Sequence, residues 1–282
     1  MRRLPPHLKK HLPKGSRAQA MRRMLSGLGL ETICDEARCP NRVECHARGT
    51  ASFLLMGDTC TRRCGFCSVK TGRPSPLDPD EPDRLAEAIR RMGLRHAVLT
   101  SVDRDDLPDG GAAHFAAAVH AVRRINPQTA IEVLTPDFGG DLGALDIVLA
   151  ARPDVFNHNL ETVPRLYPAV RRRSDFDRSL RVLHHAKRSL PSLWTKSGLM
   201  VGLGETIEEV LDTMRAARGA EVDLLTIGQY LQPTPAQVPV TEFIAPEIFG
   251  HLEREGLAMG FRAVFAGPFV RSSYLAEQVI PA

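Results

Sequence analysis

The chain has 282 residues, of which 43% are hydrophobic and 25% charged. This composition excludes an intrinsically disordered protein and suits one large α/β domain. We expect a cytoplasmic protein without a membrane span, because no apolar stretch approaches bilayer length and no secretory segment is visible. The net charge of +4 lies in the N-terminal arm, since residues 1–30 carry eight basic and no acidic side chains. We interpret the arm as a solvated tail leading into a surface helix, with docking to an acidic protein or to nucleic acid as the alternative.

After the arm, segments rich in β-branched residues alternate with segments of helical period, a pattern typical of parallel βα units. Six strands are predicted over residues 51–57, 96–102, 130–134, 154–158, 193–201 and 222–228. Helices are predicted over residues 81–92, 111–125, 142–151, 174–189 and 205–218, followed by a helix over 245–259 and a strand over 262–265. Such units build a full or partial barrel or an open doubly wound sheet, and either fold places the active site in the loops after the strands.

All six cysteines lie between residues 34 and 67, in the patterns C-x4-C-x5-C and C-x3-C-x2-C. The two sets are Cys34, Cys39 and Cys45, and Cys60, Cys64 and Cys67. Without a secretory context, these thiols are expected to be reduced. Three thiolates on a tight loop suit three corners of a four-iron cluster and leave the fourth iron open. Zinc is the alternative, although structural zinc prefers four ligands and paired C-x2-C motifs.

The C-x3-C-x2-C loop follows the first predicted strand and has an aromatic residue, Phe66, before its last cysteine. This motif resembles the signature of the radical S-adenosylmethionine superfamily. The resemblance implies that the open iron binds S-adenosylmethionine and that one electron cleaves it to a 5′-deoxyadenosyl radical, which removes hydrogen from an unactivated carbon. It also implies an α/β fold, a partial (βα)6 barrel over residues 49–243 with extensions over 1–48 and 244–282.

Within that superfamily the chain resembles the lipoyl synthases over residues 25–274. The resemblance rests on the motifs CDEARCPNRVEC, GDTCTRRCGFCSVKTGRP, SVDRDDLPDGGA, NHNLETVPRLYP, TKSGLMVGLGE, LTIGQYLQP and GPFVRSSY. It implies a sulfurtransferase that inserts two sulfur atoms, at C6 and C8 of a protein-bound octanoyl-lysine. The N-terminal cysteine set would hold an auxiliary [4Fe-4S] cluster as sulfur donor, with Ser273 as its fourth ligand and Ser272 as the alternative. Apart from the resemblance, a serine before LAEQ is typical of a helix N-cap.

Polar residues after the predicted strands are the candidate contacts to S-adenosylmethionine. These are Asn159, Glu161, Lys196, Ser197, Gly202 and Glu205, with Phe66 in the cysteine loop. Each has a structural alternative, as a helix cap or a tight turn. Residues 104–106 are expected to form either an ion-paired loop or a contact to the cofactor or the carrier. The arginines at 171–173 are expected to form either a solvated face or a surface for an acidic carrier domain.

The resemblance also implies partners. These are octanoylated lipoyl carrier domains of the glycine cleavage H protein and of oxo-acid dehydrogenase E2 subunits, a flavodoxin or ferredoxin electron donor, and an iron-sulfur carrier protein. Neither nucleic acid nor a membrane is expected as a partner. Two other functions stay open: a biotin synthase-like radical enzyme, and a non-catalytic metal-binding module whose basic arm binds nucleic acid. The N-terminal cysteine set, Cys34, Cys39 and Cys45, together with RSSY favours the lipoyl synthase interpretation.

Overall fold

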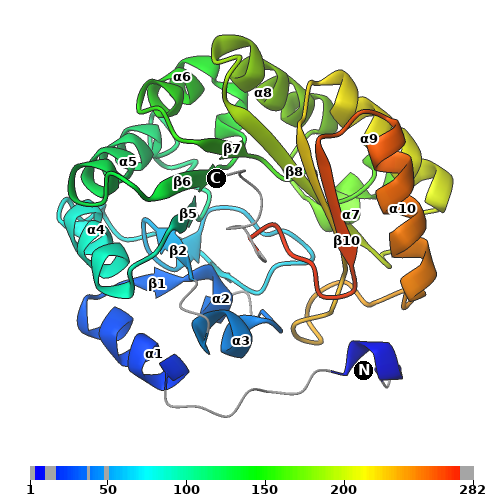
Figure 1. Cartoon of the computed structure of the whole chain (residues 1–282), viewed down its shortest axis with the longest axis horizontal. Helices are drawn as coiled ribbons and strands as arrows, with labels where there is room; N and C mark the ends of the chain where they lie inside the picture. Colours follow the sequence, from blue (N-terminus) through cyan, green and yellow to red (C-terminus); the bar gives the residue numbers. More distant parts are fainter. Residues whose placement is uncertain (1–3, 10–16, 37–38, 48–50, 274–282) are drawn as a thin grey trace.

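The fold is a curved eight-stranded sheet with helices on its outer side (Figure 1). The computed structural model describes residues 4–9, 17–36, 39–47 and 51–273. Strands follow one another in sequential order, β1-β2-β5-β6-β7-β8-β9-β10, and successive pairs from β2 onward are parallel. A doubly wound sheet would reverse its strand order at a switch point. The predicted partial (βα)6 barrel is therefore confirmed.

The six barrel strands lie close to their predicted positions. They are β2 (Ser52–Leu55), β5 (His96–Ser101), β6 (Ala130–Leu134), β7 (Val155–Asn157), β8 (Trp194–Val201) and β9 (Leu224–Gln229). Strand β10 (Ala263–Gly267) adds a further parallel strand beside β9, and β1 (Glu31–Thr32) pairs antiparallel with β2. Strand β2 ends earlier than predicted because Met56 and Gly57 adopt positive φ angles of 66° and 86°, which turn the chain into the loop of the second cysteine set.

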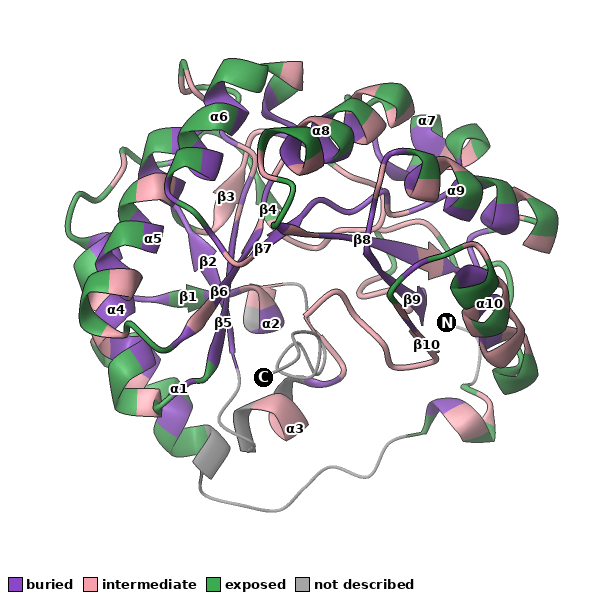
Figure 2. Ribbon diagram, turned by 45° about the horizontal axis from the view of Figure 1, so that its top comes forward, coloured by how far each residue is buried: buried purple, intermediate pink, exposed green. Residues whose placement is uncertain are grey.

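Long helices pack outside the strands. They are α4 (Glu81–Met92), α5 (Ala112–Ile125), α6 (Leu142–Ala150), α8 (Phe176–Ser189), α9 (Ile207–Gly219) and α10 (Pro246–Ala258). Local caps define their ends: Thr206 and Glu209 form a capping box that starts α9, and Asp175 accepts a hydrogen bond that starts α8. Figure 2 shows the result, with strands buried at the centre and helices exposed only on their outer faces. No helix in these described ranges is long and apolar enough to cross a membrane.

The N-terminal extension is built from short elements. They are η1 (Pro6–Leu8), α1 (Arg17–Gly27), α2 (Ile33–Glu36) and α3 (Arg42–Ala47). Helix α1 is the surface helix expected after the basic arm, and it buries Met21 and Leu25 against the barrel core. Further short elements lie in the loops: β3 (Thr59–Cys60), β4 (Lys70–Thr71), η2 (Phe138–Gly140), η3 (Pro164–Leu166) and α7 (Tyr167–Val170).

A charged network ties the barrel strands together from inside. Glu132 on β6 accepts hydrogen bonds from the Lys196 ammonium on β8, at 3.0 and 3.1 Å, and from the Asn157 amide on β7, at 2.7 Å. His96 on β5 lies 3.2 Å from the same carboxylate. Burial opposes ionisation of Glu132, but Lys196 and His96 outweigh it and lower its pKa to about 2. The barrel interior is therefore held together by a carboxylate that stays charged.

Candidate functional site

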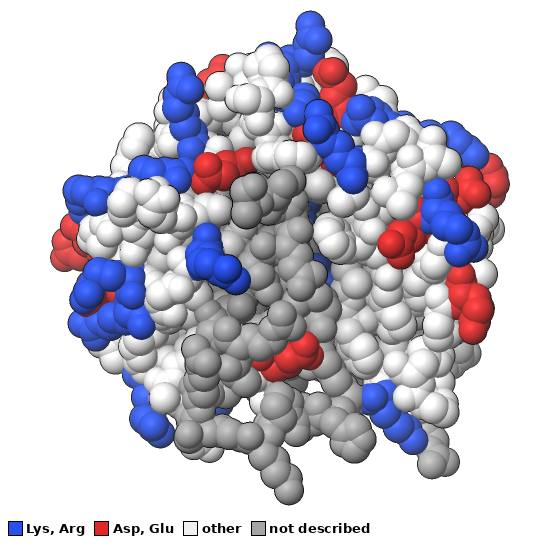
Figure 3. Space-filling model, viewed as in Figure 1, with Lys and Arg blue, Asp and Glu red and all other residues white. Residues whose placement is uncertain are grey.

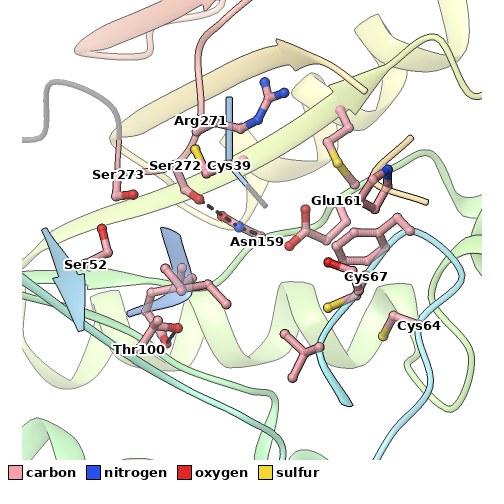
Figure 4. A pocket seen from close by; sticks show the side chains of 18 of the residues that line it. Cys39, Ser52, Cys64, Cys67, Thr100, Asn159, Glu161, Arg271, Ser272 and Ser273 are labelled. Carbon is pink, nitrogen blue, oxygen red and sulfur yellow. Dashed lines mark hydrogen bonds between the residues drawn. The ribbon is translucent and has the colours of Figure 1, made fainter. Parts of the chain in front are cut away.

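A cavity of about 450 Å³ lies at the carboxyl ends of the barrel strands. Its walls include Cys34 and Cys39 of the first cysteine set and all three cysteines of the second set. Figure 4 shows Cys64 and Cys67 on one side of the pocket, with Cys39 and Ser273 across from them. The fold thus brings two distant parts of the N-terminal third of the chain, and a residue near its end, to one cavity.

The loop of the second cysteine set packs directly on α7. The Gly65 amide donates to the Val170 carbonyl at 2.8 Å. A Cβ at Gly65 would lie 2.4 Å from the Ala169 carbonyl oxygen, a distance that real Cβ atoms do not show. Glycine at this position therefore sets how closely the cysteine loop can approach α7.

Arg62 anchors the same loop to the rest of the barrel. Its guanidinium, with only 4% of the side chain exposed, pairs with Asp103 at 3.3 Å, Asp105 at 2.7 Å and Asp137 at 2.8 Å. Asp137 is fully buried and also accepts from Arg178 Nε at 2.8 Å. Of the two sequence-based interpretations of the loop after β5, the ion-paired one is therefore observed.

The buried thiols of the second set fit a cationic metal cluster. Burial raises the pKa of Cys60 to about 11, with Asp103 adding to the effect, and raises the pKa values of Cys64 and Cys67 to about 12. Such thiols stay protonated near neutral pH unless a nearby positive charge, such as that of iron, stabilises the thiolate. Among the described side chains, no group of three or more His, Cys, Asp or Glu residues is arranged to hold a metal ion. The thiols instead border a cavity with room for a larger group.

The first cysteine set lies on the N-terminal extension. Cys34 lies on α2 and Cys45 on α3, and the Cys39 amide donates to the Cys34 carbonyl at 3.0 Å. Cys45 is half-buried and is outside the cavity lining. None of the six cysteines, all within the described residues, forms a disulfide. The Asn41 side chain donates to the Phe269 carbonyl at 2.6 Å, so the extension contacts the C-terminal segment.

The C-terminal segment carries the two candidate serine ligands. Ser272 and Ser273 both line the cavity, and Ser272 Oγ accepts a hydrogen bond from the Asn159 amide at 3.2 Å (Figure 4). Ser273 makes no hydrogen bond within the described part of the chain, so its hydroxyl is the freer of the two. The alternative role of a helix N-cap involves the segment that begins at Tyr274, which lies outside the described residues.

Three of the predicted cofactor contacts line the cavity: Phe66, Asn159 and Glu161. Asn159 Nδ2 donates to Glu161 Oε1 at 3.0 Å. Glu161 has a φ of 67°, a strained backbone conformation for a side-chain-bearing residue, and burial raises its carboxyl pKa. Strain of this kind is found at sites where geometry serves binding or catalysis.

The other four predicted contacts, Lys196, Ser197, Gly202 and Glu205, are not part of the cavity lining, and their role toward the cofactor stays a prediction. The Lys196 ammonium pairs with Glu132 inside the barrel, and Ser197 Oγ accepts from the Leu160 amide at 3.2 Å. Glu205 accepts from the amides of Gly202 and Leu203, which closes the turn before α9. Gly202 serves that turn, with a φ of 99°. The tight turn considered for this glycine-containing segment is thus present.

Three buried polar atoms without hydrogen-bond partners among the described residues indicate ligand-binding residues, two of which were not predicted from the sequence. Ser101 Oγ, Thr135 Oγ1 and Asn159 Oδ1 are buried, line the cavity and have no hydrogen-bond partner in the structure as described. Buried polar atoms are rarely left unpaired, which indicates that a polar ligand completes them. Ser101 and Thr135 stand at the carboxyl ends of β5 and β6, and that position alone could have identified them.

Arg171 is a second residue with a role larger than predicted. Its buried guanidinium lines the cavity and contacts the Tyr167 hydroxyl at 3.3 Å, Ser179 Oγ at 2.9 Å and His158 Nε2 at 3.3 Å. Burial, followed by Arg171 itself, lowers the His158 pKa to about 3, so this imidazole is neutral. Arg171 forms no ion pair with any described carboxylate, and an anionic ligand would complete its environment.

A partial βα barrel with the cysteines of a C-x3-C-x2-C motif at its mouth defines a radical S-adenosylmethionine enzyme. Residues 54–217 match the radical SAM superfamily, and residues 1–39 match the N-terminal domain of lipoyl synthase of the radical SAM family. Two solved structures share the fold. Methylornithine synthase has a TM-score of 0.57 and 16% identity, with coverage of 94% of this chain and 88% of that one. HydG, a maturase of the [FeFe]-hydrogenase, has a TM-score of 0.59 and 13% identity, with coverage of 74% of this chain and 49% of that one.

Sequence relatives resolve the family within this class. Lipoyl synthase from Thermus thermophilus is 55% identical over 280 residues, which are 99% of this chain and 87% of that protein. Lipoyl synthase from Rubrobacter xylanophilus is 54% identical over 274 residues, covering 97% and 85% of the two chains. The chain therefore belongs to the lipoyl synthase family. It is an enzyme whose cofactors are S-adenosylmethionine and [4Fe-4S] clusters.

Proposed function

We propose that the chain inserts two sulfur atoms, at C6 and C8, into an octanoyl group on a lysine of a carrier protein, giving lipoyl-lysine. One observation carries the proposal: residues of both cysteine sets and Ser273 line the same cavity. An acyl chain bound there would have the radical-forming site on one side and the sulfur donor on the other. The cavity also has an apolar wall suited to an eight-carbon chain, formed in part by Leu54, Leu134, Leu199 and Met200.

The chain offers ligands for both clusters. Cys60, Cys64 and Cys67 would hold the cluster that binds S-adenosylmethionine, and Cys34, Cys39, Cys45 and Ser273 would hold the auxiliary cluster. When bound, these cofactors supply one-electron chemistry that removes hydrogen from an unactivated carbon, together with the sulfur that replaces it. Because burial raises the pKa values of these thiols, a free thiolate is unfavourable there, and a thiolate is expected only when bound to metal. Oxygen is a poorer ligand for iron than thiolate, so Ser273 would release its iron more readily than a cysteine would.

Other residues of the cavity bind and orient. Arg171 supplies an unpaired positive charge for the carboxylate of S-adenosylmethionine, while Asn159, Ser101 and Thr135 offer polar atoms for its amino and hydroxyl groups. Glu161, kept close to Asn159 by a hydrogen bond, is a further acceptor. The apolar wall excludes water, which protects a reactive carbon centre from side reactions.

The finer assignments belong to the same proposal. Carriers would be the glycine cleavage H protein and E2 subunits of oxo-acid dehydrogenases, and a flavodoxin or ferredoxin would supply electrons. An iron-sulfur carrier protein would rebuild the consumed auxiliary cluster. Free thiols on all six cysteines suit the reducing cytoplasm. We keep residues 1–48 and 244–282 as extensions that serve the auxiliary cluster, around a radical-forming barrel over 49–243.

The test is an anaerobic reaction. The reconstituted protein is mixed with S-adenosylmethionine, reductant and an octanoyl-lysyl peptide, and both peptide mass and 5′-deoxyadenosine are followed. We expect a gain of two sulfur atoms with loss of two hydrogen atoms, accompanied by 5′-deoxyadenosine. Formation of 5′-deoxyadenosine without sulfur gain would indicate another radical enzyme, such as one resembling biotin synthase. If the iron-loaded protein does not cleave S-adenosylmethionine, the result would favour a non-catalytic metal-binding module.

Paired serine variants test the auxiliary ligand. Ser273→Ala is expected to retain cleavage of S-adenosylmethionine and to lose sulfur insertion, because only the auxiliary cluster is affected. Ser272→Ala removes the hydroxyl bonded to Asn159 and is the matched control, expected to keep measurable sulfur insertion. The reverse pattern would assign the ligand to Ser272. A Ser273→Cys enzyme with normal turnover would contradict the argument that a weak oxygen ligand is needed.

A further inference from the structure

Three exposed arginines stand together beside the mouth of the cavity. Arg63 lies in the loop of the second cysteine set, and Arg172 and Arg173 follow α7. The two segments are adjacent because the Gly65 amide donates to the Val170 carbonyl at 2.8 Å. We call Arg63, Arg172 and Arg173 the arginine rim. Its members are sequence neighbours of Cys64 and Arg171, which line the cavity, but they are not part of the lining themselves.

The rim is positively charged because nearby acidic side chains are engaged elsewhere. Asp105 pairs with the buried Arg62 at 2.7 Å, Asp106 pairs with Arg104 at 2.9 Å, and Asp175 accepts from the amide that starts α8. The three rim arginines make no ion pair with any carboxylate of the described ranges. Figure 3 shows Lys and Arg side chains spread around the edge of the face seen in Figure 1, with Asp and Glu side chains among them. Asp105 also interacts with Arg173 through space, since Arg62 foremost and Arg173 to a smaller extent lower its pKa. An acidic surface approaching this edge would therefore meet guanidinium groups that no ion pair with a described carboxylate occupies.

A hollow in the surface accompanies these charges. It has a volume of about 390 Å³ and is lined by Arg172, Arg173 and residues of η3, α7 and the start of α8. Its apolar walls are Pro164, Tyr167, Pro168 and Phe176. Arg171 lines both this hollow and the main cavity, so the two spaces are neighbours. The lining also includes Asp175, whose carboxylate accepts from the Arg178 amide at 2.7 Å. Three arginines against one hydrogen-bonded carboxylate, beside apolar walls, suit an acidic side chain with an aliphatic stem.

The backbone of the rim is held in a strained conformation. Arg173 has a φ of 67°, which is uncommon for a residue with a side chain. Its carbonyl accepts a hydrogen bond from Arg178 Nη2 at 2.8 Å, and Arg178 is itself fixed by Asp137. Backbone strain that the surrounding structure maintains is concentrated at binding and catalytic sites. The position of Arg173 is thus set by the network that also anchors the cysteine loop.

We propose that the arginine rim and its hollow dock an acidic surface of the protein that carries the octanoyl-lysine. The inference rests on the proposed function, and it adds the place and the chemistry of carrier recognition. A carrier whose lysine reaches the cavity must contact the surface beside the mouth, where the rim lies. Complementary charge raises the rate of productive encounter and fixes orientation more than it adds contact energy. The rim should therefore matter for a protein substrate and not for a small peptide.

The test compares two substrates with the cluster-loaded enzyme. One is an octanoylated carrier domain with an acidic surface, and the other is a short uncharged octanoyl-lysyl peptide. In the Arg172→Glu/Arg173→Glu variant, we expect kcat/KM for the carrier to fall roughly tenfold or more, mainly through KM, with a weaker dependence on salt. Sulfur insertion into the peptide should stay at the parent rate. Arg63 is left intact because it lies between cluster cysteines.

A double variant of equal charge change provides the control. Arg95 and Arg188 are exposed and form no ion pair with any residue of the described ranges. They stand before β5 and at the end of α8, at the opposite end of the barrel. Arg95→Glu/Arg188→Glu should leave kcat/KM for the carrier unchanged within about twofold. Equal losses with this control would show a general charge effect and overturn the docking site.

The remaining outcomes are distinguishable from one another. Unchanged carrier kinetics in the rim variant would overturn the proposal, as would equal losses on carrier and peptide, which would show damage to the cavity. If the rim variant instead loses affinity for a labelled oligonucleotide while carrier kinetics persist, the rim binds nucleic acid and not a carrier. Absence of sulfur insertion into the peptide by the parent enzyme would count against the proposed function itself.

Discussion

Asp137 is the buried carboxylate on which two arginines converge. It pairs with Arg62 at 2.8 Å and accepts from Arg178 at 2.8 Å. Burial opposes its ionisation, but Arg62 and other nearby positive charge outweigh burial and lower its pKa to about 2. A permanently charged Asp137 therefore holds the cysteine loop and the start of α8 in register with the end of β6.

Replacing Asp137 by asparagine tests that role. The Asp137→Asn variant leaves a buried guanidinium with less negative charge around it, so the free energy of unfolding should fall by about 3 kcal/mol. Urea unfolding of parent and variant measures the difference. Asp146→Asn, which removes an ion pair with His185 at the surface, is the control and should change stability by less than about 1 kcal/mol. Unchanged stability of Asp137→Asn would mean that Asp103 and Asp105 suffice for Arg62.

At the scale of single residues, the sequence identified those whose role follows from local spacing. Cys60, Cys64 and Cys67 belong to one short motif, and the structure brings all three to the cavity. The pairing of Lys196 with Glu132 could not be predicted, because Glu132 is 64 residues away and only the folded sheet brings the two side chains together. Arg171 was underestimated because its burial depends on contacts with Ser179 and His158 that no local pattern reveals.

The Glu132 network acts at the scale of elements, since it links β6 to β5, β7 and β8. In Glu132→Gln the buried Lys196 loses its counter-charge, and the free energy of unfolding near neutral pH should fall by about 3 kcal/mol. Because the folded pKa is lowered, Glu132 stabilises the fold above its unfolded pKa of about 4.3, and this contribution is lost as pH falls towards about 2.

The stability of parent and variant should therefore converge in acid. Urea unfolding at about pH 6, 5, 4 and 3 tests this, with the difference expected to shrink only below about pH 4. Glu208→Gln at the surface is the control and should follow the parent at every pH. A constant difference across the series would show that the network stabilises through packing and not through charge.

The contact between the loop of the second cysteine set and α7 can be tested with a substitution at Gly65. A Gly65→Ala Cβ would lie 2.4 Å from the Ala169 carbonyl oxygen, so the loop must move away from α7. We expect the variant to lose most 5′-deoxyadenosine formation, because displacement of a reacting group by about 1 Å can cost on the order of a hundredfold in rate. Iron content and 5′-deoxyadenosine are the measurements.

A neighbouring glycine of the same loop gives the matched control. A Cβ at Gly72 would lie 3.5 Å from the Thr59 side chain, an ordinary contact, so Gly72→Ala should keep parent activity. Equal loss in both variants would indicate that the loop tolerates no added side chain, whatever its contact with α7.

Elements with strong periodicity or caps were predictable, and short ones were not. The predicted helix over 81–92 coincides with α4, and the strand over 130–134 coincides with β6. Helices α2 and α3, which carry cysteines, have four and six residues, too few to show a hydrophobic period. Their conformation depends on packing against other parts of the chain, such as the contact between Asn41 and the Phe269 carbonyl.

The whole molecule closes one side of its cavity with its two extensions. The N-terminal extension brings Cys34 and Cys39 to the cavity, and the segment after β10 brings Ser272 and Ser273 to the same wall. The barrel type follows from the alternation of strands and helices, whereas the meeting of the extensions depends on long-range contacts that only the folded chain defines. Sulfur donation would therefore depend on how closely the last described residues pack on β9.

Gly228 tests that dependence. A Cβ at this position of β9 would lie 2.0 Å from the Val270 carbonyl oxygen and 3.0 Å from Arg271 Nη1. The Gly228→Ala variant must displace the segment that carries Ser273, while the second cysteine set keeps its contact with α7. We expect sulfur insertion into an octanoyl-lysyl peptide to fall on the order of a hundredfold and 5′-deoxyadenosine formation to persist.

The control for this variant is Gly250→Ala in α10, where a Cβ would meet only Arg254 Nη1, at 3.5 Å, and alanine favours the helix. It should keep both activities. If Gly228→Ala loses 5′-deoxyadenosine formation as strongly as sulfur insertion, the damage extends to the radical-forming site and the two halves of the cavity are not separable. If it retains full sulfur insertion, the C-terminal segment adjusts without moving Ser273, and close packing on β9 is not what positions the ligand.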